Sequence, residues 1–203
     1  MVESSGRIRP VNPLSTSCVR PGALAYQFAT GPRLEQLLEL LRDTAGWGQI
    51  IGPHGSGKST LVRTLLPRLP DVGLRPFVFD LHDRQRRMPT GWQQLSSGPR
   101  DVRPVIVVDG YEQLSVLARW NLRRTCRARD WGLVITAHRS IGFPMLYRTH
   151  TTPVLAEALM QQLFDDRAIS IPSSQIQDSF QRHRGNMRDV FMELFDRYEN
   201  LRR

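Results

Sequence analysis

The sequence contains almost no lysine. Of its 28 Lys and Arg side chains, 27 are arginine and only one, Lys58, is lysine. Arginine supplies a planar guanidinium fork, whereas lysine supplies a compact ammonium on a flexible stem. The chain therefore uses arginine for every general cationic role, and the segment around Lys58 requires an ammonium in particular.

Cysteine is scarce as well. The two cysteines, Cys18 and Cys126, stand far apart and lack the spacing of metal ligands. This excludes a disulfide framework and a cysteine-rich zinc site. The sequence also has no apolar stretch long enough to cross a bilayer, and no apolar segment of a secretory signal near its start. We therefore expect reduced thiols, no membrane contact and a cytoplasmic location.

Acidic side chains are outnumbered, and the net charge is +9. Such a bias suits an acidic protein or nucleic acid as partner, or simply an arginine-rich surface. Arg119, Arg123 and Arg127 recur every four residues and would share one helical face, with Arg124 beside them. No set of aromatic residues for base stacking accompanies them. A solvated face is the simplest interpretation, and binding to nucleic acid or to an acidic protein stays an alternative.

Glycines are concentrated around Lys58. The segment consists of Gly52, Pro53, His54, Gly55, Ser56, Gly57, Lys58, Ser59 and Thr60. It matches G-x-x-x-x-G-K-[ST], the Walker A pattern of a phosphate-binding loop. The backbone N–H groups of such a loop point at an anion, and the helix that follows adds its N-terminal partial charge. The segment predicts a nucleoside triphosphate site, with Lys58 on the β- and γ-phosphates and Ser59 on Mg²⁺.

Apolar segments of two kinds alternate along the chain. The predicted strands are residues 47–51, 75–80, 105–108, 133–135 and a short strand within 144–152. The predicted helices are residues 34–41, 58–66, 114–127, 154–164, 173–183 and 187–198. Alternation of strands and helices favours an α/β fold with a doubly wound, mostly parallel sheet, and ligands at the carboxyl ends of the strands.

The chain divides into three parts by composition. Residues 1–20 hold Pro, Ser and Thr with little apolar periodicity, so we expect a flexible arm there. Residues 21–152 contain the alternating pattern and the Walker A segment, which predict a nucleotide-binding core. Residues 153–203 read as helices alone, and we expect them to form a small helical lid.

Carboxylates follow two of the predicted strands. Asp109 ends the apolar run 105–108, as in a Walker B segment, where the carboxylate meets Mg²⁺. Glu112 is the candidate base for an attacking water. The alternative is that Glu112 only favours the N-terminus of the next helix through its dipole. Asp80, at the end of the second predicted strand, is the reserve candidate.

Two other residues are candidates for contact with a γ-phosphate. Thr136 follows the fourth predicted strand, and His138 and Arg139 come next and would face the same edge. Asn186 would cap the last helix, which puts Arg188 in its first turn. The helix dipole disfavours a cation there, so we expect Arg188 to have another role. An ordinary strand-end threonine and a surface arginine are the alternatives.

These motifs together resemble the additional-strand P-loop ATPases. The likeness rests on the Walker A segment, a strand before Asp109, and Thr136 on the next strand. Residues 185–188 and the final helices are similar to the second sensor and lid of AAA+ ATPases. Residues 109–112 resemble the extended Walker B segment of STAND ATPases, including NACHT domains.

The resemblance implies ATP and Mg²⁺ as cofactors. It places Lys58 and Ser59 on phosphate and Mg²⁺, and Asp109 on the metal. It makes Thr136 the first sensor and Arg188 the second. Residues 23–28 would lie beside the adenine.

The expected function is an ATP-binding protein, and an Mg²⁺-dependent ATPase that couples ATP binding and hydrolysis to conformational change or assembly. Assembly would imply a homo-oligomer. The first alternative is a nucleotide-gated adaptor for DNA or protein with little turnover. The second is a P-loop small-molecule kinase, in which residues 84–87 would serve as an arginine-rich lid.

Overall fold

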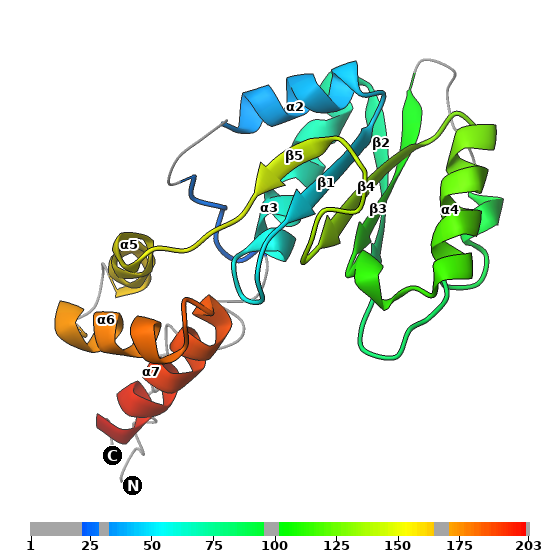
Figure 1. The fold of residues 1–203 in the computed structure, drawn as a ribbon. Helices are drawn as coiled ribbons and strands as arrows, with labels where there is room; N and C mark the ends of the chain where they lie inside the picture. The colour runs from blue at the N-terminus through cyan, green and yellow to red at the C-terminus, as the bar shows by residue number, and fades with distance from the viewer. Residues whose placement is uncertain (1–21, 29–32, 96–101, 165–170, 202–203) are drawn as a thin grey trace, which may run out of the picture.

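The structure, a computed structural model, describes residues 22–28, 33–95, 102–164 and 171–201 (Figure 1). They form an α/β arrangement in which a central sheet is followed by a group of C-terminal helices. The arm predicted at residues 1–20 lies outside the described residues, as does Cys18.

Five parallel strands form the sheet. They are β1 (Trp47–Ile51), β2 (Leu74–Asp80), β3 (Arg103–Asp109), β4 (Gly132–Ala137) and β5 (Met145–Arg148). Their order is β2-β3-β4-β1-β5, and each neighbouring pair is parallel. The predicted α/β class and parallel pairing are confirmed. The order puts β4 between β1 and β3, so three strand ends that carry candidate residues are adjacent.

Helices cover both faces of this sheet (Figure 1). They are α2 (Leu34–Asp43) and α3 (Lys58–Leu65) on one face and α4 (Val116–Ala128) on the other. Along β3, Val105 and Val107 pack on the first face, whereas Ile106 and Val108 pack on the second. Since successive strand residues point to opposite faces, a strand that is covered on both sides must be apolar throughout.

Short 3₁₀ turns connect several elements: η1 (Leu66–Val72), η2 (Trp92–Gln94) and η3 (Tyr111–Gln113). Gly110 has a φ of 82°, which lets the chain turn directly from β3 into η3. Ser115 then caps α4, because its Oγ accepts a hydrogen bond from the Ala118 N–H at 3.3 Å. The helix predicted from residue 114 therefore begins at Val116.

The C-terminal helices have a core of their own. They are α5 (Pro153–Phe164), α6 (Ser173–Arg182) and α7 (Met187–Leu201). Their shared buried side chains are Ala156, Met160, Phe164, Ile176, Met187, Val190, Leu194 and Tyr198. These helices pack beyond the carboxyl ends of β1 and β5 (Figure 1). Among the described helices none is long and apolar enough to span a membrane.

Candidate functional site

The glycine-rich loop between β1 and α3 approaches the C-terminal helices closely. Gly55 and Gly57 have φ values of 66° and 89°, in the left-handed region that favours glycine. A Cβ on Gly55 would lie 1.6 Å from Asn186 Oδ1. A side chain at position 55 is therefore excluded by both conformation and space, and the loop backbone lies against the start of α7.

The loop is supported from the edge strand β5. The Ser56 Oγ donates to the Pro53 carbonyl at 2.8 Å and lies 2.6 Å from the Thr149 Oγ1. The Thr149 N–H donates to the Ile51 carbonyl at 2.8 Å, which fixes this residue beside the end of β1. Ser56 is buried, so these bonds hold the loop in shape from its interior side.

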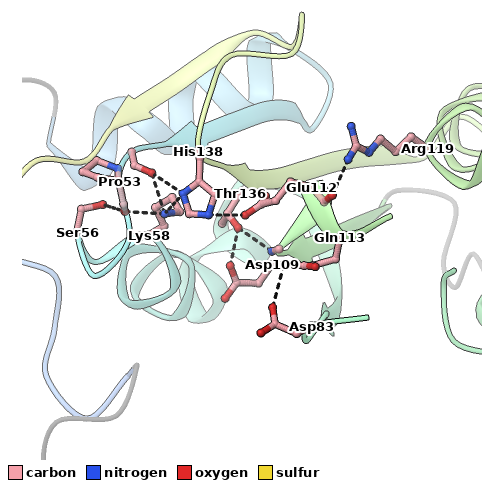
Figure 2. A network of polar contacts seen from close by, with 12 residues as sticks. Pro53, Ser56, Lys58, Asp83, Asp109, Glu112, Gln113, Arg119, Thr136 and His138 are labelled. Atoms are coloured by element: carbon pink, nitrogen blue, oxygen red, sulfur yellow. Dashed lines mark hydrogen bonds and ion pairs between the residues drawn. The ribbon is translucent and has the colours of Figure 1, made fainter. Parts of the chain in front are cut away.

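Lys58 opens α3 and folds back over the loop (Figure 2). Its Nζ donates to the carbonyl oxygens of Gly52 and Pro53, both at 2.8 Å, and lies 3.3 Å from His138 Nδ1. Burial lowers the pKa of Lys58, and the two neighbouring carboxylates oppose that shift. The ammonium is thus held by carbonyl oxygens of its own loop, in a partly desolvated position.

His138 bridges the loop and the segment after β3. Its Nε2 lies 2.8 Å from Glu112 Oε1, while its Nδ1 faces Lys58 (Figure 2). An ionised carboxylate can only accept a hydrogen bond. The proton between His138 and Glu112 therefore lies on Nε2 of His138. The His54 ring lies against the His138 ring, with 3.8 Å between the ring centroids and 39° between the ring planes. Burial, followed by the charges of His138 and Lys58, lowers the pKa of His54.

Glu112 uses only one of its two carboxylate oxygens in these contacts. Its Oε2 is buried and has no hydrogen-bond partner among the described residues. The Glu112 backbone is fixed, since Arg119 donates to its carbonyl oxygen at 2.6 Å. A buried acceptor without a partner is costly and calls for an explanation such as catalysis. This oxygen has a free acceptor site, which a water or a substrate would reach once the side chains around it move.

Asp109 and Thr136 form a pair across neighbouring strands. The Thr136 Oγ1 donates to Asp109 Oδ1 at 2.5 Å and accepts from the Gly110 N–H at 2.9 Å (Figure 2). Thr136 therefore orients the carboxylate of Asp109. The reserve candidate Asp80, one strand further out, is instead paired with Arg63.

Ser59 and Asp109 are the predicted Mg²⁺ ligands. In the part of the chain that the structure describes, no group of three or more His, Cys, Asp or Glu side chains is arranged to hold a metal. Mg²⁺ at nucleotide sites takes one or two protein oxygens and completes its octahedron with phosphate and water oxygens. One hydroxyl and one carboxylate therefore fit Mg²⁺ held jointly with a nucleotide, and they do not fit an all-protein metal cage.

The start of α7 contacts the loop directly. The Met187 N–H donates to the Gly55 carbonyl at 3.2 Å. The Asn186 Oδ1 accepts from the Arg188 N–H at 3.2 Å, which confirms the predicted cap. The Arg188 side chain is exposed, and its charge adds a small further lowering to the pKa of His54. Arg188 thus lies within electrostatic reach of the loop.

A mainly apolar cavity lies beside Gly57. It is enclosed by residues 24–27, by the first turn of α3 and by side chains of α5 and α7, among them Leu155 and Phe191. Residues 23–28, expected beside a base, thus contribute most of one wall. The cavity opens next to the glycine-rich loop, as a site for an apolar ring joined to a phosphate chain would require.

The predicted arginine face of α4 points largely toward the protein. The Arg119 guanidinium lies 5.5 Å from the centre of the Tyr111 ring, and that of Arg123 lies 4.2 Å from the Phe143 ring. The Arg127 guanidinium lies 5.6 Å from the centre of the Trp47 ring, on β1. These arginines pack their stems and charges on aromatic faces. They fasten α4 to the sheet and to the segment after β3.

The role of His138 as a bridge was missed by reasoning from sequence. Its position two residues beyond Thr136, at the shared strand edge, was the available signal. The bridge itself depends on β4 lying between β1 and β3. No protein-family model matches the chain, and no curated protein matches it in sequence.

Proposed function

We propose that the chain is a P-loop ATP-binding protein and a Mg²⁺-dependent ATPase of the additional-strand class. One observation carries the proposal. His138 brings the Lys58 ammonium and the Glu112 carboxylate into one network, 3.3 Å and 2.8 Å from its two ring nitrogens. A triphosphate whose terminal group met Lys58 would therefore lie next to a carboxylate with an unused oxygen.

The residues take separate roles in this proposal. The loop N–H groups and Lys58 bind the phosphates, and Lys58 exchanges its bonds to the Gly52 and Pro53 carbonyls for bonds to phosphate oxygens. Glu112 orients the attacking water and accepts its proton through Oε2. The water oxygen attacks the γ-phosphorus, and the bond to the β,γ-bridging oxygen breaks, releasing ADP and phosphate.

Magnesium fits the donor set described above. Ser59 and Asp109 would hold it, and the ion would neutralise charge on the β- and γ-phosphate oxygens. Thr136 keeps Asp109 in place, because its hydroxyl donates to the carboxylate and accepts from the Gly110 N–H. In this role Thr136 acts through Asp109.

The strand order supports the additional-strand assignment. An extra strand, β4, lies between the strand that leads into the loop and the strand that ends at Asp109. The α5–α7 helices support the likeness to an AAA+ lid, because the Met187 N–H bonds the loop at Gly55. Arg188, in the first turn of α7, would complete the site from that side.

Isothermal titration of the purified chain with ATP, in Mg²⁺ and in EDTA, tests the proposal together with a phosphate-release assay. We expect saturable binding that Mg²⁺ strengthens, and slow but measurable release of phosphate. Measuring the specific rate at increasing protein concentration tests assembly, because sites completed between subunits would raise it. Absence of ATP binding under both conditions would refute the proposal.

A second function, a nucleotide-gated adaptor with little turnover, is favoured by one observation. Glu112 is already engaged by His138, and Gly110 rather than a second carboxylate follows Asp109. Tight ATP binding would favour this function if no phosphate is released, either alone or after DNA or protein is added. Stimulation of ATP consumption by a nucleoside or a sugar would point to a kinase instead.

A further inference from the structure

The first turns of α4 expose apolar side chains. Val116, Leu117 and Trp120 are 78%, 79% and 59% exposed, and they are three of the six large exposed apolar side chains among the described residues. Positions 116 and 120, and 117 and 120, are spaced to share one helical face. Clustered exposed apolar side chains are unfavourable in water and mark interaction surfaces.

A groove runs along this face. One wall is α4, from Ser115 to Asn121, and the other is the segment 87–93, which includes Met88 and the buried Trp92. Leu117 and Trp120 line the groove. The walls are joined at one end, where the Ser115 N–H donates to the Arg86 carbonyl at 3.0 Å. The groove is therefore bounded by two fixed segments rather than by a loose loop.

Arginine predominates around the groove, and the exposed Asp83 and Asp130 lie just outside the two segments that form it. Residues 84–95 and 115–129 together contain eight arginines and no aspartate or glutamate. Arg84, Arg86, Arg87 and Arg124 are exposed, and the Arg124 guanidinium lies 5.4 Å from the centre of the Trp120 ring. An occupant that carries carboxylates at its edges would complement this rim.

We propose that this groove docks an acidic amphipathic helix of a partner protein. The apolar side of such a helix would cover Leu117 and Trp120, and its carboxylates would meet the exposed arginines. A nucleic acid fits less well, because Trp120 is the only one of the three exposed side chains that offers a ring for a base to stack on. In addition, Arg119 and Arg123 are turned inward onto Tyr111 and Phe143. The proposal is independent of nucleotide binding.

A random 16-residue peptide library displayed on phage tests the proposal. Sequences are selected on the full chain and counter-selected on the double variant Leu117→Gln/Trp120→Gln. We expect the enriched peptides to carry net negative charge and apolar residues three and four positions apart. Synthetic copies of these peptides should bind about tenfold more weakly to the double variant and to Arg124→Glu, as for central interface residues. Added salt should weaken binding further.

Two matched controls keep the test specific. Val154→Ser removes a side chain that is 76% exposed on α5. Arg42→Glu reverses a charge that is 63% exposed on α2. Both variants should bind the peptides as the parent does, and circular dichroism should show every variant folded.

Three outcomes would overturn the proposal. The enriched peptides could be neutral or basic, or counter-selection on the double variant could remove every sequence that binds the parent. A 15-nucleotide single strand could bind more tightly than any peptide and lose affinity in the same variants, which would assign the groove to nucleic acid. Sedimentation could show a dimer of the parent that the double variant abolishes, which would assign the groove to a second copy.

Discussion

Two carboxylates in this protein, Glu112 and Glu193, are embedded in opposite ways. Glu193, on α7, accepts from Ser179 at 2.7 Å and from Arg197 at 2.6 Å, and it also pairs with Arg182 and His183. Both of its oxygens are used. Glu112 lies in η3, just beyond the carboxyl end of β3. One of its carboxylate oxygens contacts His138, and the other has no partner among the described residues.

The difference separates a structural carboxylate from a candidate catalytic one. Burial alone would raise the pKa of Glu193, but hydrogen bonds from Ser179, Arg182 and His183 lower it to about 2. A saturated carboxylate stabilises the folded chain and has no capacity left for a substrate. A carboxylate with an open oxygen adds little to stability and keeps that capacity. Substitution of Glu193 should therefore lower the stability of the fold, whereas substitution of Glu112 should lower turnover and leave stability largely unchanged.

The largest effect is expected for Lys58→Ala. The change deletes the only lysine ammonium of the chain, so ATP affinity should fall by roughly 100-fold or more, while the free energy of unfolding changes little. Titration calorimetry and urea unfolding measure the two quantities. Lys58→Arg is the matched control: because the guanidinium fork is planar and larger, it should recover only part of the affinity. Near-normal ATP binding by folded Lys58→Ala would remove the proposed function.

Glu112→Gln should be next in size. It should leave ATP affinity close to that of the parent and lower phosphate release by about 10²-fold, as for loss of a general base. Stability should be unchanged or slightly raised, because the change removes a buried charge with an unpaired oxygen. Asp80→Asn is the control, and its turnover should stay at the parent rate. The reverse result would move the catalytic base to Asp80.

Glu193→Gln should lower the stability of the fold and leave activity unchanged. It should lower the free energy of unfolding of the chain by roughly 1.5–3 kcal/mol, the range for hydrogen bonds to charged groups, without weakening ATP binding. Urea unfolding and calorimetry check both halves. Loss of nucleotide affinity with unchanged stability would make Glu193 a functional residue and erase the contrast with Glu112.

The same carboxylate predicts an acid dependence. Its pKa is about 2 in the folded chain against an ordinary value of 4.5, so its contribution is complete above pH 4.5. That contribution is lost as the pH falls from 4.5 toward 2. The difference in unfolding free energy between parent and Glu193→Gln should therefore shrink over this window. A difference that stays constant from pH 5 to pH 2.5 would contradict the prediction.

Arg188 should give the smallest effect, on protection of α7. If it meets the γ-phosphate, ATP should slow hydrogen exchange in residues 187–200 more than ADP does. Arg188→Ala should abolish that difference and leave ADP affinity nearly unchanged. Arg182→Ala, which removes an ion pair with Glu193 of α7 but no charge near the loop, is the control and should preserve the difference between ATP and ADP. Equal protection by ATP and ADP in the parent would make α7 a packing element.

Much of the fold could be predicted from local patterns. The strand Trp47–Ile51, the loop and the helix after it are found where glycine, lysine and apolar spacing predicted them. Each depends on residues close in sequence. The order of the strands could not be predicted in this way, and the contacts of His138 and Thr136 depend on that order. Reasoning from sequence could propose these residues, but it could not pair them.

The exposed apolar face of α4 could not be predicted from sequence for a different reason. Nothing in the sequence marks Val116, Leu117 and Trp120 as exposed, and Arg119, Arg123 and Arg127 look like a solvated stripe. The structure reverses part of this pattern, because the guanidinium groups of these arginines lie over aromatic rings of the protein. Hydrophobic periodicity alone assigns arginine to solvent, and it therefore fails where arginine fastens a helix.

The single lysine also makes the loop chemically addressable. Within these 203 residues, acylating reagents have one side-chain amine to modify and a lysine-specific protease has one bond to cut, after Lys58. Burial lowers the pKa of that amine and so favours its reactive neutral form. Acetylation there would remove the charge assigned to phosphate. Under the proposed function, any lysine modification in this chain would compete with nucleotide for the same atom, and the extent of labelling would measure occupancy.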